Sequence, residues 1–236
     1  MKLSVLVPIY NEERTLEELV RRVCAVPMAK EIILVDDGSK DHSREILARL
    51  QQENGGAGDG INKVRVFFQA QNEGKGAALK TAIGHVTGDV VIIQDADLEY
   101  DPKDYPSLLQ PIEAGLADVV YGTRFAGGGA HRVLFFWHSM GNRLLTLLSN
   151  MLTNLNLSDM EVGYKVFRAE LLKGIELKSK RFGFEPEITM KLAKQRCRFY
   201  EVPISYHGRT YEEGKKITWK DGMAALYYMI RFRFGD

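Results

Sequence analysis

The sequence contains little cysteine, and this excludes two kinds of scaffold. Its 236 residues include two cysteines, Cys24 and Cys197, which lie far apart and form no CxxC spacing. Such a pair supports neither a disulfide framework nor a structural zinc site. The low cysteine content fits a reducing compartment.

Long apolar runs and a strong charge bias are also missing. No stretch of about 18 residues is apolar and uncharged, so no membrane-spanning helix is expected. The N-terminus enters a strand-like run, Leu3 to Ile9, without the basic and apolar regions of a signal peptide. The formal net charge is +1, which gives no reason to expect a nucleic-acid partner.

The first half of the chain alternates strand and helix patterns. Short β-branched runs predict strands at Leu3–Val7, Glu31–Val35, Lys63–Phe68, Asp89–Gln94 and Asp118–Tyr121. Amphipathic patterns between them predict helices at Glu12–Val23, Ser43–Gln52, Gly76–His85 and Pro106–Ala114. This order predicts an α/β fold with a Rossmann-like, mostly parallel central sheet and helices on both faces.

The second half follows a different pattern. It opens with a glycine-rich, basic segment at 122–132 and continues with a long Leu- and Phe-rich helical stretch from Val133 to Leu157. Later patterns predict a strand at Gly163–Arg168, a helix at Glu185–Lys194, a strand at Phe199–Ile204 and an amphipathic helix at Trp219–Phe234.

Polar clusters follow the predicted strands of the first half. They are Pro8–Glu13, Asp36–Asp41, Gln71–Gly76, Asp95–Glu99 and Gly122–Arg124. In open parallel sheets ligands bind at the carboxyl ends of the strands. We therefore expect these clusters to form one site.

The acidic cluster after the fourth predicted strand suits a divalent cation. Asp95 and Asp97 flank one small residue, and Glu99 offers a further carboxylate. Mg²⁺ and Mn²⁺ take oxygen ligands and are commonly held by one or two carboxylates together with substrate phosphates. Taken alone, this motif fits a strand-end turn with solvated carboxylates equally well.

The clusters after the first two strands suit a nucleoside. Asp36 and Asp37 can accept hydrogen bonds from a base or a ribose, although an Asx turn with helix capping by Ser39 or Asp41 is an alternative. One of the two aspartates can bind while the other caps. Tyr10 offers a flat face to a base.

Other loops supply a turn and positive charge. Asn11 is a candidate helix N-cap. The segment around Gly74 and Gly76 resembles a weak dinucleotide fingerprint, with Leu79 at the third glycine position, so we interpret it as a tight turn that brings the backbone or Lys75 to a ligand. Cationic residues that suit phosphate groups, unless they are simply solvated, are Arg124, Arg132, Arg209, Lys215 and Lys216.

Together these motifs resemble family 2 glycosyltransferases of the dolichyl-phosphate mannose synthase-like group. The similar motifs occur in order along nearly the whole chain: VPIYNEE, VDDGSKD, NEGKG, QDADLEYDP, YGTRF, GYKVFR, GFEPEIT and EVPISYHGRTYEEGKKI. The resemblance implies one GT-A domain, with a nucleotide-sugar-binding half at 1–123, an acceptor-side half at 124–216 and a terminal helix at 217–236.

The resemblance also implies roles for particular residues. Those expected around the donor are Pro8, Tyr10, Glu12, Val35, Asp37, Lys75, Asp95 and Ala96. Those expected to bind the metal are Asp95, Asp97 and Glu99, and those expected to act in catalysis are Asp97, Arg124, Arg209 and Lys215. Arg124 and Ser139 match positions that contact an acceptor phosphate, and Arg209 and Lys215 belong to a loop that closes over the donor.

The expected activity is a metal-dependent, inverting transfer of a hexose. Mannose or glucose, from GDP-mannose or UDP-glucose, would pass to a polyprenyl or dolichyl phosphate, with Mg²⁺ or Mn²⁺ bound. A phosphate monoester has a second pKa near ~6 and needs no strong general base, which agrees with the lack of a convincing Ser-His-Asp or Cys-His pattern. The alternatives are a non-lipid acceptor, a sugar nucleotidyltransferase and a silent sugar-nucleotide-binding protein.

A lipid acceptor requires contact with a membrane. We expect a cytoplasmic protein that associates peripherally with the cytoplasmic face of the membrane, whereas many relatives in this group carry transmembrane helices. The terminal sequence ALYYMIRFRF combines aromatic residues with Arg231 and Arg233, which is typical of an interfacial helix. A helix packed on the sheet with its arginines in solvent fits equally well.

Overall fold

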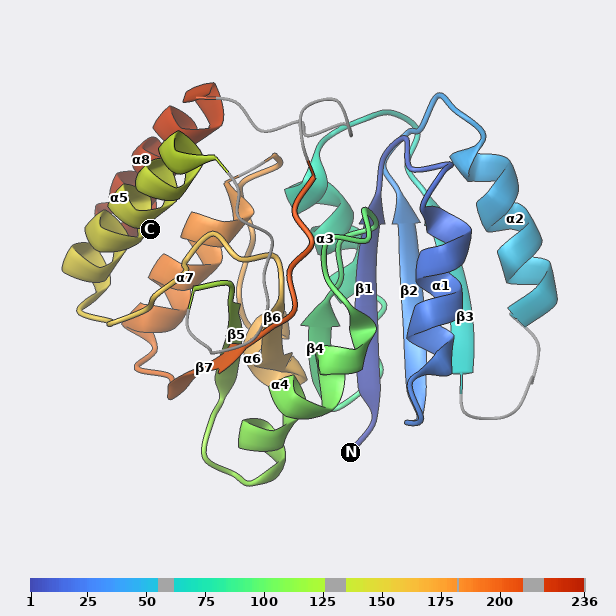
Figure 1. The fold of residues 1–236 in the computed structure, drawn as a ribbon, viewed down its shortest axis with the longest axis horizontal. Coiled ribbons are helices and arrows are strands. Elements are labelled where there is room, and N and C mark those ends of the chain that lie inside the picture. Colours follow the sequence, from blue (N-terminus) through green and yellow to red (C-terminus); the bar gives the residue numbers. More distant parts are fainter. Residues whose placement is uncertain (55–61, 126–134, 182, 210–218, 236) are drawn as a thin grey trace.

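The described residues form one seven-stranded mixed sheet at the centre of the molecule (Figure 1). The computed structural model describes residues 1–54, 62–125, 135–181, 183–209 and 219–235. The strands are β1 (Leu3–Ile9), β2 (Lys30–Asp36), β3 (Asn62–Phe68), β4 (Val90–Ile93), β5 (Val119–Thr123), β6 (Lys165–Arg168) and β7 (Phe199–Pro203). They lie in the order β3-β2-β1-β4-β6-β5-β7, and β6 runs antiparallel to both of its neighbours.

Helices flank the sheet on both faces. They are α1 (Leu16–Ala25), α2 (Ser43–Asn54), α3 (Lys75–Ile83), α4 (Tyr105–Glu113), α5 (Phe136–Thr153), α6 (Ala169–Lys173), α7 (Phe184–Lys194) and α8 (Trp219–Phe234), with a 3₁₀ turn at Pro102–Asp104. Figure 1 shows α1 and α2 over the β1–β3 end of the sheet and α5, α7 and α8 grouped at the β7 end.

The central strands explain why the sequence folds around this sheet. Every residue of β2 and β4 is buried, and β1 is buried except at Pro8, which is half-buried. Parallel strands covered on both faces are expected to be continuous apolar runs rather than alternating ones. The α/β class and the mostly parallel sheet predicted from the sequence are confirmed.

The chain changes direction across the sheet between β1 and β4. From β1 it builds outward through β2 and β3, and it then returns to place β4 on the other side of β1. Such a switch point leaves a crevice beyond the carboxyl ends of the two strands, where ligands bind in open α/β sheets. The polar loops after β1 and β4 meet there.

Several predicted boundaries were wrong. The helix predicted from Glu12 begins at Leu16, with Thr15 rather than Asn11 at the N-cap. Asn11 instead adopts a positive φ of 53°, and its Oδ1 accepts a hydrogen bond from Lys40 N at 2.8 Å, so it links the loops after β1 and β2. The long helix predicted from Val133 to Leu157 spans Phe136–Thr153 and ends at Asn154, whose φ of 59° is typical of a left-handed helix end.

Candidate active site

The acidic pair predicted from the sequence lies directly after β4. Asp95 and Asp97 keep about a fifth of their side-chain surface exposed, and Asp97 Oδ1 accepts a hydrogen bond from Glu99 N at 3.2 Å. Burial, followed by the neighbouring carboxylates of Asp95 and Glu99, raises the pKa of Asp97 to about 7. This concentration of negative charge favours a cation.

Arg209 supplies positive charge to this acidic group. Its Nη2 lies 2.7 Å from Asp97 Oδ2, and its backbone N donates to Glu99 Oε1 at 2.9 Å. Its Nη1 lies 3.8 Å from Glu12 Oε2, in the loop after β1. The segment that leaves β7 runs along the carboxyl edge of the sheet to deliver this side chain (Figure 1). Arg209 therefore joins the β1 and β4 sides of the switch-point crevice.

A second cationic side chain, from α3, contacts the acidic pair at Asp95. Lys75, the first residue of α3, lies 2.8 Å from both Asp95 Oδ1 and Glu185 Oε1. Burial alone would lower the pKa of Lys75, but the two carboxylates outweigh it and raise that pKa well above its ordinary value. Lys75 therefore stays charged. Glu185, at the start of α7, was not predicted, because its partners are far away in sequence.

Gly163 fixes the position of Asp95. A Cβ at this glycine would overlap Asp95 Oδ2 and would lie 2.8 Å from Tyr100 Cε2. Gly163 N also donates a hydrogen bond to Tyr100 Oη at 3.0 Å. The glycine before β6 is therefore a site residue, since only a hydrogen leaves room for the aspartate.

Arg124, at the end of β5, makes a bidentate ion pair. Its Nε and Nη2 each lie 2.6 Å from one carboxylate oxygen of Asp159, and Nη2 also contacts Asn142 Oδ1 of α5 at 3.3 Å. Its guanidinium lies 5.2 Å from the centre of the Tyr206 ring. Arg124 thus lies in the loop after β5, as predicted, and Asp159 and Tyr206 hold its guanidinium in place.

Ser139 lies on the same helix as Asn142, one turn earlier, and its side chain is half-buried. The structure thus brings Ser139 to the Arg124 side of the molecule.

The loops after β1 and β2 bring the expected nucleoside residues together. Pro8 and Val35 are register partners at the ends of the two strands. Asp37 is buried and accepts hydrogen bonds from Asn72 Nδ2, Glu73 N and Gly74 N.

Asp36 accepts from Gly38 N at 3.1 Å and forms an ion pair with Arg44 at 2.8 Å. Both aspartates therefore shape turns, and Asp37 holds the glycine loop that presents Lys75.

Two further charged residues, Glu161 and Lys165, lie just before β6 and at its first position. Burial, followed by the charge of Glu185, raises the pKa of Glu161 to about 7. Burial lowers the pKa of Lys165 to about 8, despite nearby Glu185 and Glu161. Neither residue was predicted as a site residue, because each stands singly in or before a short strand with no motif around it.

Comparisons with known proteins decide the family. The model for "Glycosyl transferase family 2" matches residues 4–175. The chain belongs to glycosyl transferase family 2. This family assignment confirms the resemblance noted from the sequence motifs.

Named relatives of this family 2 chain act on a lipid phosphate. An "Undecaprenyl-phosphate 4-deoxy-4-formamido-L-arabinose transferase" of Edwardsiella ictaluri is 32% identical over 90% of the chain, and one of Pseudomonas aeruginosa (strain LESB58) is 31% identical over the same share. The chain spans 62% and 59% of the length of these relatives.

Solved structures share the fold. Glucosyl-3-phosphoglycerate synthase from Mycobacterium tuberculosis, in complex with uridine diphosphate, superposes with a TM-score of 0.74 at 19% identity, covering 98% of this chain and 80% of that one. The same enzyme with Mn²⁺, uridine diphosphate and phosphoglyceric acid gives a TM-score of 0.70 at 20% identity, covering 99% and 78%. The family 2 chain therefore has the GT-A fold.

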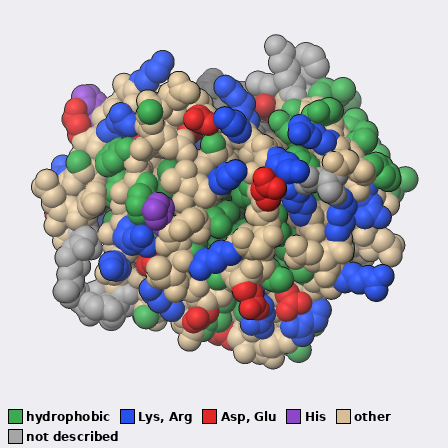
Figure 2. All heavy atoms as spheres, turned by 180° about the vertical axis from the view of Figure 1, so that it is seen from behind, with side chains coloured by type: hydrophobic (Ala, Val, Ile, Leu, Met, Phe, Trp, Pro, Cys, Tyr) green, Lys and Arg blue, Asp and Glu red, His purple; other side chains and the backbone are tan. Residues whose placement is uncertain are grey.

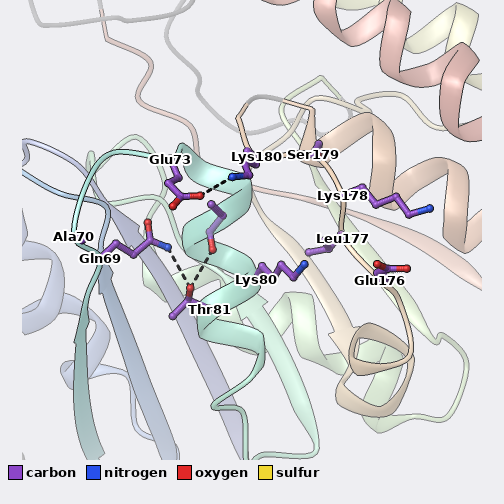
Figure 3. Close-up of a pocket in the computed structure, with 11 residues that line it drawn as sticks. Gln69, Ala70, Glu73, Lys80, Thr81, Glu176, Leu177, Lys178, Ser179 and Lys180 are labelled. Atoms are coloured by element: carbon purple, nitrogen blue, oxygen red, sulfur yellow. Dashed lines mark hydrogen bonds and ion pairs between the residues drawn. The ribbon is translucent and has the colours of Figure 1, made fainter.

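A cavity of about 670 Å³ lies away from the acidic pair. It is formed by α3 and the segment 176–180, and Figure 3 shows Lys180 reaching Glu73 and Gln69 reaching Thr81 along its wall. Its lining includes neither Asp95 nor Asp97. We therefore place the candidate active site at the switch-point crevice, where Arg209 contacts both sides.

The structure brings most of the predicted site residues to one edge of the sheet. The residues at this edge are Pro8, Tyr10, Glu12, Val35, Asp37, Lys75, Asp95, Ala96, Asp97, Glu99, Arg124 and Arg209, while Ser139 lies on α5. Lys215 lies outside the described residues. Glu185, Asp159, Tyr206 and Gly163 were not predicted as site residues, and each contacts one that was.

Proposed function

We propose that this protein is an inverting glycosyltransferase that moves a hexose, mannose or glucose, from a nucleotide diphosphate sugar to a polyprenyl phosphate. The observation that supports the proposal is the half-buried acidic pair Asp95 and Asp97 at the switch-point crevice, where Lys75 pairs with Asp95 and Arg209 pairs with Asp97. The names of the relatives support a polyprenyl phosphate as the acceptor class.

The acidic pair fits Mg²⁺ or Mn²⁺ in the chemistry of its ligands. Among the described residues, no three His, Cys, Asp or Glu side chains converge closely enough to hold a metal by themselves. Two carboxylate residues, Asp95 and Asp97, are nevertheless what such ions commonly use when substrate phosphates complete the shell. Glu99 is a third candidate, although it now accepts hydrogen bonds from Tyr206 and Arg209. When bound, the cation would supply positive charge to the diphosphate of the donor.

Arg209 and Lys75 then have complementary roles in binding the donor. Arg209 pairs with Asp97, and its guanidinium is suited to pairing with a phosphate oxygen should the acidic pair bind a cation. Lys75 holds Asp95 and Glu185 in place and remains charged. Charge placed in advance around a leaving diphosphate stabilises it as the glycosidic bond breaks, and losing one such group typically costs about 100-fold in rate or more.

The acceptor is expected on the side of Arg124. An acceptor phosphate monoester is largely ionised at neutral pH, so its oxygen can attack the anomeric carbon without a strong general base. Asp159 fixes the Arg124 guanidinium through Nε and Nη2 of the arginine. Arg124 Nη1 makes no hydrogen bond to that carboxylate. We propose that Arg124, with Ser139, orients the acceptor phosphate on the face opposite the leaving group, which inverts the anomeric centre.

A donor panel tests the proposed function. Purified protein is incubated with a short polyprenyl phosphate and Mg²⁺ or Mn²⁺, and with GDP-mannose, UDP-glucose or a nucleotide-activated 4-deoxy-4-formamido-L-arabinose. The expected result is one glycolipid product with inverted anomeric configuration by NMR. Product that forms only on a non-lipid acceptor, or pyrophosphate release from a sugar phosphate and a nucleoside triphosphate, would refute it.

An acidic-pair variant tests the role of the metal site. Asp97→Ala should lower turnover at least ~100-fold while its circular dichroism spectrum stays like that of the wild type. Exposed Glu113, at the end of α4, is the matched control, and Glu113→Ala should retain full turnover. Full activity of Asp97→Ala, or of the wild type in excess chelator, would contradict the role of the acidic pair.

A further inference from the structure

One lysine is buried close to the candidate active site. Lys and Arg side chains are spread over the face of the molecule shown in Figure 2, which is their ordinary position in a protein. Lys165, at the first position of β6, is instead 1% exposed. Its ammonium donates a hydrogen bond to the carbonyl oxygen of Val162 and lies 4.6 Å from the centre of the Tyr121 ring.

This hydrogen bond holds one end of a single peptide unit. The peptide between Val162 and Gly163 has its carbonyl bonded to Lys165, and its N–H donates to Tyr100 Oη at 3.0 Å. Tyr100 is itself buried and stacks on Tyr164, with the ring centres 4.8 Å apart. Both polar groups of the peptide unit are therefore fixed by buried side chains.

The peptide unit held in this way lies directly against Asp95. A Cβ on Gly163 would overlap Asp95 Oδ2, so the glycine backbone and the carboxylate are in close contact. Tyr100 belongs to the same loop as Asp95, and the hydrogen bond from Gly163 N ties that loop to the entry of β6. A shift of this peptide unit would therefore change the position of the carboxylate.

Lys165 also contacts a second series of bonds that leads to the acidic pair. Tyr121 Oη lies 2.8 Å from Thr189 Oγ1, and that hydroxyl donates to the backbone carbonyl of Glu185 at 2.7 Å. The side chain of Glu185 in turn holds Lys75 beside the acidic pair. The buried ammonium thus lies between the two structures that support the acidic pair.

Stability alone does not explain a charge at this position. Burying an ammonium is costly, and one carbonyl and an aromatic face replace only part of its hydration. Glu161 and Glu185 attract the ammonium, but the contacts that it makes are with Val162 and Tyr121. Because apolar side chains of similar volume often replace buried charges without loss of stability, the charge of Lys165 needs another reason.

We propose that Lys165 is a positioning residue for the acidic pair: by holding the peptide between Val162 and Gly163, it keeps Asp95 where it can bind a divalent cation. This inference rests on the proposed function for the presence of the cation. Groups that orient a metal ligand typically contribute about 10–100-fold to metal affinity or activity.

Metal binding tests the proposal directly. The probe is Mn²⁺ in the presence of GDP or UDP, measured by electron paramagnetic resonance on Lys165→Met and on Tyr100→Phe, which removes the hydroxyl that accepts from Gly163 N. The matched control is Lys30→Met, because Lys30 is 2% exposed and its ammonium also donates to backbone carbonyls, but at the opposite end of the strands. Wild type and control should bind Mn²⁺ alike, and the two variants should bind it at least about tenfold more weakly.

Unfolding measurements separate positioning from a purely structural role. Lys165→Met/Glu161→Gln removes both buried charges, so its midpoint in urea should be no lower than that of the wild type, while its Mn²⁺ affinity stays low. In transfer assays, raising the Mn²⁺ concentration should restore part of the turnover that Lys165→Met loses.

Three results would overturn the positioning role. They are wild-type Mn²⁺ affinity in Lys165→Met, a urea midpoint of the double variant that falls together with its metal affinity, and wild type that binds no Mn²⁺. Wild type that binds Mn²⁺ but transfers sugar to no acceptor would refute the proposed function and leave the positioning result standing.

Discussion

Gly163 offers a sharp test of how the acidic pair is positioned. Substitution by alanine adds one methyl group, which would overlap Asp95 Oδ2 and lie 2.8 Å from Tyr100 Cε2. Non-bonded carbon atoms normally lie about 3.5–4.0 Å apart. The side chains of Asp95 and Tyr100 must therefore move by roughly 1 Å.

The displacement has two separable effects. Inserting a methyl group into a packed region costs about 1–3 kcal/mol of unfolding free energy. A shift of ~1 Å in a group that positions the reacting atoms can cost about 100-fold in rate. Because a loss of about 2 kcal/mol leaves most molecules of a stable domain folded, the rate should fall far more than the folded fraction.

The assay compares Gly163→Ala with Gly141→Ala, the matched control. A Cβ at Gly141, inside α5, meets no atom within 4 Å, so this alanine should keep full activity and gain up to about 1 kcal/mol of stability. Initial transfer rates and urea unfolding are measured on both. If Gly163→Ala keeps more than half of the wild-type rate, then Gly163 does not set the position of Asp95 and the reasoning is wrong.

Two further predictions concern buried and surface ion pairs. Lys75→Met leaves Asp95 and Glu185 without their shared cation and should destabilise the protein by roughly 3 kcal/mol. In urea unfolding, adding Glu185→Gln to this variant should restore part of the lost stability. Strict additivity of the two changes in unfolding free energy would count against the shared pairing. The bidentate pairing with Arg198 lowers the pKa of Asp118 to about 2, so its stabilisation is fully present above pH ~4 and is lost as the pH falls towards 2. Because Arg198 is half-exposed, Asp118→Asn should lower the unfolding free energy by only about 1 kcal/mol at pH 7. In thermal unfolding, the stability difference between wild type and variant should shrink from pH 7 down to pH 3. A difference that stays constant would disprove the link between the Asp118 pKa and stability.

The fold was predictable from the sequence because its strands are buried on both faces and its polar loops follow them. β2 and β4 appear as continuous apolar runs, and Asp37 and Asp95 mark their carboxyl ends. The direction of β6 was not predictable, since a run of four residues, Lys165–Arg168, carries no sign of which neighbour it pairs with.

Site residues that belong to one loop could be predicted from the sequence. Site residues that become neighbours only when two distant segments meet could not. Asp95 and Asp97 could be predicted as site residues because they directly follow an apolar strand in the sequence. Glu185 becomes a site residue only because α7 brings it to Lys75, 110 positions earlier in the chain. Similarly, Asp159 could not be assigned to Arg124 from the sequence, because the pairing depends on the reversed strand that follows it.

The reversal of β6 has a consequence for how this family 2 chain could diversify. Because β6 runs opposite to its neighbours, its entry loop reaches the same rim as the exits of the parallel strands, and it carries Asp159 and Gly163 there. Arg124, Asp159 and Gly163 thus come from one stretch of the chain, whereas the donor side combines loops of the first hundred positions with Glu185 and Arg209. If this stretch binds the acceptor as proposed, we expect that exchanging it between homologues changes the acceptor more than it changes the transferred sugar.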